Sequence, residues 1–249
     1  MKILEQLLDT LPAEPIPVRN VIMGVHWTLV SSRFCGLGST LAEKNHHSHH
    51  EHHGHSLVRD VGKLHQKTAQ ELAQWILSDN SLEASIGIAA INSLLEIDES
   101  KLEQINAANV IERECGGKNL VVVGHFPFVE RMKTIAKNCW VIEKHPSGGD
   151  FPEQAAQEYI PQAHIIAITG TSLINHTIEG LLSLCPKDSL VMLLGPSTPL
   201  TPLLFDFGVS FLSGARVYDE KAAILTIQQG AAFTQVQGVR LFTMVKNGR

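Results

Sequence analysis

Four short apolar runs, each followed by a loop of small or polar residues, constrain the fold of this chain more than any other feature. The first run, Leu120–Val123, contains three valines and leads directly into Gly124. Similar runs follow at 139–143, 164–169 and 189–195. Continuous apolar runs of this length are typical of parallel strands that are buried on both faces. Their spacing of about 20 to 25 residues suits strands joined by helical crossovers, so the pattern predicts a doubly wound α/β domain.

The rest of the chain predicts helices and short strands on both sides of a polar break at 98–100. We expect helices at 1–11, 63–77, 82–95, 129–137 and 219–229, strands at 18–25, 25–30 and 209–212, and a turn at Gly36 and Gly38. Two strands followed by two helices form a small α+β domain. We therefore predict an α+β domain at residues 1–97 and a Rossmann-like domain at residues 98–249.

Composition and charge exclude several classes of protein. A net charge of −5 without a Lys/Arg-rich face argues against nucleic acid as a partner. No apolar run approaches the roughly 20 residues that would span a membrane. The four cysteines form no CxxC pair, which suits reduced thiols and predicts a cytoplasmic protein. The expected partner is a metal ion or a small molecule, and a homo-oligomer stays open.

The loops that follow the first two runs carry one histidine and one carboxylate. In open α/β sheets ligands bind at the carboxyl ends of the strands. His125 could there be a metal ligand, a general base or a hydrogen-bonded loop residue. The loop lacks the Gly-x-Gly-x-x-Gly pattern of dinucleotide sites. Glu143 ends the second run 19 residues after Gly124, where an acid could bind a ribose or could simply be solvated.

The loops after the third and fourth runs are rich in hydroxyl groups. The segment from Thr169 to Ser172 is expected to open a helix that continues through residues 175 and 176, with Thr171 or Ser172 as its N-cap. Its amides could hold an anion or simply begin a helix. The loop 196–198 places two hydroxyls beside proline, and neither loop has the Gly-x-Ser-x-Gly pattern of a hydrolase.

A histidine-rich run has the most direct metal chemistry in the chain. Seven of the 13 histidines lie within ten residues, at His46, His47, His49, His50, His52, His53 and His55. Imidazole is a common ligand of nickel, cobalt and zinc, so the run predicts a loop that gathers such a transition metal. The alternative is a low-complexity insert without a biological role.

Three motifs occur in order and resemble the DUF364 family, whose members are described as heavy-metal chelation proteins. They are Val123–Phe128, Ile168–Asn175 and Leu194–Leu200. In the first half, Gly24–Gly38 and Ser85–Asn92 resemble the N-terminal domain that accompanies this family. The resemblance covers almost the whole chain.

The resemblance implies an enolase N-terminal-like domain, a Rossmann-like domain and a ligand site in the cleft between them. Carried over by motif, His125 is the candidate catalytic residue, and the candidate ligand-binding residues are Phe126, Glu143, Thr169, Gly170, Thr171, Asn175, Pro196, Ser197 and Thr198. The histidine run is an addition to the family pattern.

These observations favour a protein that binds a transition metal or a metal-chelating small molecule. The alternative is an enzyme that acts on a nucleotide-like molecule or a metal-cofactor precursor, with His125 as acid and base and Glu143 orienting the ligand. A third interpretation is a nucleotide-binding regulatory module.

Overall fold

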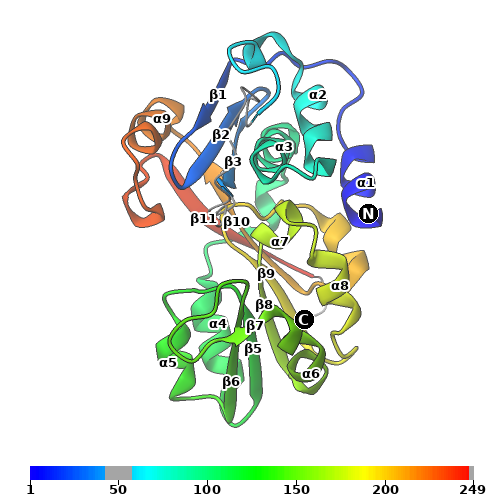
Figure 1. The fold of residues 1–249 in the computed structure, drawn as a ribbon, viewed down its shortest axis with the longest axis vertical. Coiled ribbons are helices and arrows are strands. Elements are labelled where there is room, and N and C mark those ends of the chain that lie inside the picture. Colours follow the sequence, from blue (N-terminus) through cyan, green and yellow to red (C-terminus); the bar gives the residue numbers. More distant parts are fainter. Residues whose placement is uncertain (43–57, 247–249) are drawn as a thin grey trace, which may run out of the picture. The chain divides into compact units, whose positions relative to one another are not determined.

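The computed structural model describes residues 1–42 and 58–246. The histidine run lies outside the described residues. The chain forms two compact units, each built from separate segments of the sequence (Figure 1). The first unit comprises Met1–Glu96, Leu173–Asn175 and Ala215–Arg240, and the second comprises Ile97–Ser172, His176–Gly214 and Leu241–Arg249. The expected division into domains at residue 97 stays a prediction, because compact packing does not show which segments fold independently.

The first unit is built on a three-stranded antiparallel sheet with the order β1-β2-β3. Its strands are β1 (Asn20–Met23), β2 (Trp27–Ser31) and β3 (Cys35–Ser39), and its helices are α1 (Lys2–Asp9), α2 (Ala69–Ala73), α3 (Ser81–Leu94) and α9 (Glu220–Gln228). Helix α3 packs against β2 and β3 (Figure 1). As expected for a helix that is apolar nearly all round, most of α3 is buried.

The turn predicted at Gly36 and Gly38 is wrong, because both residues lie inside β3. They are glycines because α3 approaches the strand too closely for any side chain. A Cβ atom on Gly36 would lie 2.2 Å from the carbonyl oxygen of Ala89, and one on Gly38 would lie 2.5 Å from the Ile88 side chain. Glycine inside a strand marks such a close approach as often as it marks a turn.

The single helix predicted at 63–77 is also wrong. Thr68 is extended, with ψ of 156°, and its hydroxyl accepts a hydrogen bond from the Glu71 amide, while the Glu71 carboxylate accepts one from the Thr68 amide. This capping box starts α2 at Ala69 and separates it from a 3₁₀ turn at Leu64–Gln66. The apolar residues keep their four-residue spacing across the extended Thr68, so this spacing alone does not show that the helix is interrupted.

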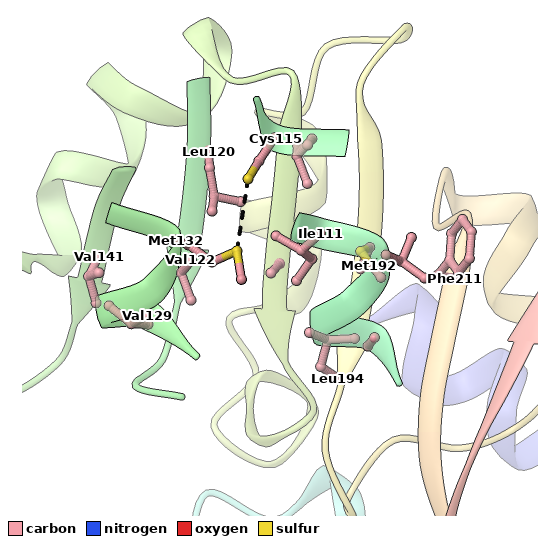
Figure 2. Packing of buried hydrophobic residues seen from close by; sticks show 14 residues of the cluster. Ile111, Cys115, Leu120, Val122, Val129, Met132, Val141, Met192, Leu194 and Phe211 are labelled. Atoms are coloured by element: carbon pink, nitrogen blue, oxygen red, sulfur yellow. Dashed lines mark hydrogen bonds between the residues drawn. The ribbon is translucent and has the colours of Figure 1, made fainter. Parts of the chain in front are cut away.

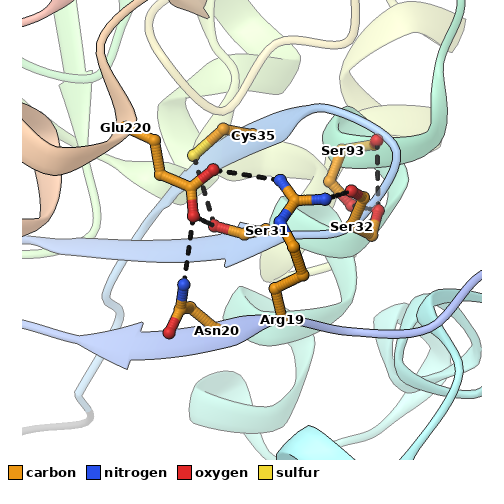
Figure 3. A network of polar contacts seen from close by, with 7 residues as sticks. All are labelled: Arg19, Asn20, Ser31, Ser32, Cys35, Ser93 and Glu220. Carbon is orange, nitrogen blue, oxygen red and sulfur yellow. Dashed lines mark hydrogen bonds and ion pairs between the residues drawn. The ribbon is translucent and has the colours of Figure 1, made fainter.

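Glu220, the first residue of α9, ties this helix to the sheet of the first unit (Figure 3). Its carboxylate accepts hydrogen bonds from Asn20 Nδ2 at 3.0 Å and from Ser31 Oγ at 2.6 Å, and it pairs with the Arg19 guanidinium at 3.0 Å. Burial raises the pKa of this carboxyl group. The three donors together outweigh that effect and lower the pKa below its usual value.

The second unit is organised by an eight-stranded sheet with the order β4-β11-β10-β9-β8-β5-β6-β7. The pairs from β7 to β10 are all parallel. The strands are β4 (Leu102–Glu103), β5 (Asn119–Val123), β6 (Asn138–Glu143), β7 (Phe151–Pro152), β8 (Ile165–Thr169), β9 (Leu190–Leu194), β10 (Phe211–Val217) and β11 (Val239–Val245). This order of the six parallel strands is that of a Rossmann fold, so the predicted α/β class is confirmed.

Helices lie on both faces of this sheet, as a doubly wound fold requires (Figure 1). They are α4 (Ala107–Cys115), α5 (Val129–Lys133), α6 (Ala156–Tyr159) and α8 (Ile178–Ser183), with the short α7 (Thr171–Ile174) after β8. Between α4, α5 and the sheet lies a core of buried apolar residues that includes Ile111, Leu120 and Val122 (Figure 2). In the part of the chain that the structure describes, no helix is long and apolar enough to cross a membrane.

The helix predicted to run through residues 175 and 176 is wrong, because α7 ends at Ile174. His176 has a φ of 61°, a left-handed conformation that interrupts an α-helix. The predicted N-cap is wrong as well, since Thr171 and Ser172 both lie inside α7. The Thr171 amide instead donates to Thr169 Oγ1 at 3.3 Å.

Candidate functional site

The second unit has a topological switch point between β5 and β8. From β5 the chain continues to β6 and β7 on one side, and then returns to β8 on the other side. The loops after these two strands therefore leave the sheet in different directions, and ligands of open α/β sheets bind at this place. The candidate site described below consists of the loops after β5, β6, β8 and β9.

The backbone of the loop after β5 lies against the side chain of Thr169, the last residue of β8. Gly124 has a φ of +99°, and a Cβ atom at this position would lie 2.9 Å from Thr169 Cβ. Only glycine allows this conformation and this approach. The Phe126 ring lies 3.6 Å from the same Cβ position and stacks on Phe128, with 5.1 Å between the ring centroids. The sequence motif after β5 thus shapes a tight loop beside Thr169.

Hydroxyl groups gather where β8 ends. Thr169 Oγ1 lies 3.0 Å from Thr171 Oγ1, and Ser172 Oγ donates to the Thr169 carbonyl at 2.7 Å. Thr169 and Thr171 are half-buried, so their hydroxyls are within reach of a bound molecule. Because α7 is only four residues long, its dipole adds little to the binding of an anion.

The loop after β9 contributes a buried hydroxyl that has no hydrogen-bond partner among the described residues. This is Thr198 Oγ1, in a residue that is only 2% exposed. Two glycines enclose the threonine: a Cβ atom on Gly170 would lie 2.6 Å from Oγ1, and one on Gly214 would lie 2.5 Å from the Thr198 carbonyl oxygen. An unpartnered buried hydroxyl costs about 1–3 kcal/mol, so a bound molecule that hydrogen-bonds it would recover this free energy.

His125, in the loop after β5, and Asp150, in the loop after β6, form a pair of opposite ionisable groups at this edge of the sheet. His125 Nδ1 lies 3.6 Å from Asp150 Oδ2, a distance for an ion pair rather than a hydrogen bond. The histidine side chain is 54% exposed, whereas that of Asp150 is only 2% exposed. Because the buried carboxylate lies beside Nδ1, Nε2 is the ring nitrogen left for a ligand.

Sequence reasoning missed Asp150. The available signal was the Gly148-Gly149 pair before it, in which both glycines have positive φ and shape the turn ahead of β7. The turn is closed by hydrogen bonds between Ser147 and Asp150, which fix the position of the carboxylate. The oxygen that accepts from the Ser147 amide, Asp150 Oδ2, is also the one that lies beside His125 in the loop after β5.

The other predicted residues lie in three places. Glu143 ends β6, level with the loop after β5, because Ile142 pairs with Val123. Ser197 is buried beside Gly170, and Pro196 is half-buried in the same loop after β9. Asn175 belongs to the first unit, unlike the rest of the predicted set. The assignment of these residues to a ligand site stays a prediction.

The described residues fit a metal ion only in part. Within residues 1–42 and 58–246, no group of three His, Cys, Asp or Glu side chains is arranged to hold a metal. All four cysteines are free thiols, and burial raises the pKa of each. The histidine–aspartate pair offers at most two donors. Further donors would have to come from a bound molecule or from the histidine run.

Two family models match the chain. The model of DUF364, with the description "Putative heavy-metal chelation", matches residues 106–246. The model of DUF4213, with the same description, matches residues 4–95. These descriptions support metal binding in general terms.

Relatives of known sequence or structure agree with this fold. The chain is 25% identical over 186 residues to an uncharacterized protein from Methanocaldococcus jannaschii, a match that covers 72% of each chain. A crystal structure of a DUF364 family protein of unknown function from Desulfitobacterium hafniense superposes with a TM-score of 0.80 at 26% identity, covering 98% of this chain and 97% of that one. A second such structure, from Pyrococcus horikoshii, gives 0.81 at 19% identity with 98% of each chain covered.

Proposed function

Because the chain belongs to the DUF364 family, we propose that it binds a transition-metal ion together with a small chelating molecule at the carboxyl edge of the second unit's sheet. The observation that carries this proposal is the pair of His125 and Asp150 at the switch point. Asp150 lies beside Nδ1, so Nε2 is the free donor of the ring. Ligating histidines commonly have a carboxylate at their other nitrogen in this way.

A chelating molecule supplies the donors that the protein lacks here. Two side-chain donors cannot complete the four to six positions that nickel, cobalt or zinc prefer. The hydroxyls of Thr169 and Thr171 would hydrogen-bond the polar groups of such a molecule, and the Phe126 ring would contact its apolar part. The site therefore suits a metal chelate better than a bare ion.

The histidine run supplies a second kind of metal binding under this proposal. Its seven imidazoles, at residues 46–55, would gather metal ions and raise their concentration near the protein. Such a run binds several metals with little selectivity. The ion that reaches the sheet edge would then be selected by the chelating molecule.

Elemental analysis of protein purified without a metal-affinity resin tests whether the histidine run and the sheet edge each bind metal. We expect metal in the full chain, less metal after deletion of residues 46–55, and a further loss when His125→Ala is added to the deletion. The control His164→Ala changes a histidine that precedes β8, at the opposite edge of the sheet, and should lose nothing further. Absence of metal from the full chain would contradict the proposal, as would equal losses in the two histidine variants.

A second function, an enzyme that acts on a nucleotide-like molecule or a metal-cofactor precursor, is favoured by the same histidine–aspartate pair. A carboxylate beside an imidazole orients it for proton transfer. In this case Glu143 would orient the ligand at the neighbouring strand end. The test is thermal stabilisation of metal-free protein by adenosine, which Glu143→Ala should abolish. No stabilisation by adenosine would contradict the nucleotide-like form of this second function.

A further inference from the structure

A cluster of sulfur atoms lies in the core of the second unit, between α4, α5 and the sheet. Cys115 Sγ, at the end of α4, contacts Met132 Sδ of α5 at 3.8 Å (Figure 2). The two residues are 0% and 1% exposed. Two sulfurs that bind one ion at about 2.3 Å lie about 3.8 Å apart in a tetrahedral arrangement and about 4.0 Å apart in a trigonal one. The Cys115 thiol donates a hydrogen bond to the thioether at this distance, which equals the separation of two sulfurs on one ion.

A third sulfur-containing residue, Cys139, packs against the same core. Cys139 pairs with Leu120 in the β5–β6 register, and Val141 pairs with Val122. Because paired residues of neighbouring strands point to the same face, Cys139 points to the face that Leu120, Val122 and Val141 cover. It packs against this core, and its pKa is raised by burial and, to a smaller extent, by Cys115.

The three residues differ in their access to solvent. Cys139 is half-buried, whereas the other two sulfurs are fully buried. An ion would thus enter past Cys139 and reach the inner pair. The charged groups that influence the two thiols are Glu112 and Lys118 at Cys115, and Lys133 and Glu130 at Cys139. Each thiol therefore has one group of either sign near it.

We propose that Cys115, Met132 and Cys139 form a binding site for a soft monovalent cation of the copper(I) class. Thiolate and thioether sulfurs select such ions over harder divalent metals. Each cysteine that ligates the ion loses its thiol proton to solvent, so binding of one M⁺ by both cysteines releases two protons and transfers no electron. The site shares no residue with the histidine run or with the site at the sheet edge, and it goes beyond the proposed function.

Silver(I) is the probe for the test, because it matches copper(I) in charge and softness and does not change oxidation state. The full chain is titrated in excess free imidazole, which competes for the histidine run but poorly for sulfur, and bound silver is counted by native mass spectrometry. We expect one silver ion per chain to resist imidazole. Its affinity should fall at least tenfold in Cys139→Ser and should also fall in Met132→Leu, which keeps the packing volume.

Cys185→Ser is the matched control, because Cys185, like Cys139, is a half-buried thiol of the second unit with a raised pKa, and its described contact is the Leu181 carbonyl. It should leave silver binding unchanged. The proposal is overturned if no silver resists imidazole, if Cys139→Ser and Met132→Leu bind as the unaltered chain does, or if Cys185→Ser weakens binding equally. None of these results bears on metal held by the histidine run, which imidazole removes.

Discussion

Replacing Thr198 by valine should stabilise the protein, because valine keeps the shape of the side chain and lacks the hydroxyl group. The Thr198 hydroxyl is buried and has no hydrogen-bond partner among the described residues. A buried hydroxyl without a partner costs about 1–3 kcal/mol, and valine has the same shape without the polar atom. The new methyl group would face Gly170, which has no side chain to obstruct it.

We therefore expect Thr198→Val to raise the free energy of unfolding by about 1–2 kcal/mol. For a chain of this length, this corresponds to an increase in Tm of about 2–8 °C. Urea denaturation measures the free energy directly, and a thermal melt gives the second value.

Thr243→Val is the matched control. Thr243 is also fully buried in the second unit, but its hydroxyl donates to the Ile105 carbonyl at 2.8 Å. Its replacement should destabilise the protein by about 1 kcal/mol, because the carbonyl loses its donor. The reasoning is refuted if Thr198→Val destabilises the protein as much as Thr243→Val does, since the Thr198 hydroxyl would then have a partner in solution.

Three further predictions concern packing, charge and metal. Gly36→Ala should lower the free energy of unfolding by at least about 2 kcal/mol, because its Cβ meets the backbone of α3, whereas Gly116→Ala, with open space around it, should have little effect in the same urea titration. Glu220→Gln should cost about 1–2 kcal/mol at neutral pH, because the amide cannot replace the carboxylate toward Arg19. Folding lowers the pKa of Glu220, so the stabilisation by its carboxylate is fully present above the unfolded pKa of about 4.3 and is lost as the pH falls through the folded pKa. The difference in the free energy of unfolding between the unaltered protein and Glu220→Gln should therefore shrink in acid. Deletion of residues 46–55 should reduce the number of nickel ions bound in equilibrium dialysis, and an unchanged number would contradict metal binding by the histidine run.

The parallel strands could be predicted from the sequence because their apolar runs are long, continuous and separated by regular intervals. All four expected runs correspond to strands β5, β6, β8 and β9. The terminal strand β11 was missed. Only part of Val239–Val245 is buried, so it has no continuous apolar run.

The two errors in the first unit have different physical origins. Gly36 resembles a turn residue because its close contact is with α3, which is distant in sequence, and local propensity carries no information about that contact. The capping box of Thr68 and Glu71 is local, and the Thr-x-x-Glu pattern is the sequence signal for the start of α2. Asp150 could not be predicted for the same reason as the Gly36 contact, because it becomes a candidate only when the loop after β6 is placed next to His125.

The central claim, that the sheet edge binds a metal chelate through His125, is tested most directly by calorimetric titration with nickel(II)–iminodiacetate. This chelate leaves coordination positions open to an imidazole. The titration is done on the chain that lacks residues 46–55, so that the histidine run does not contribute. We predict one binding site that is lost in His125→Ala, weakened in Asp150→Asn and retained in His164→Ala. Equal binding by all of these variants, or no binding before any substitution, would contradict the account.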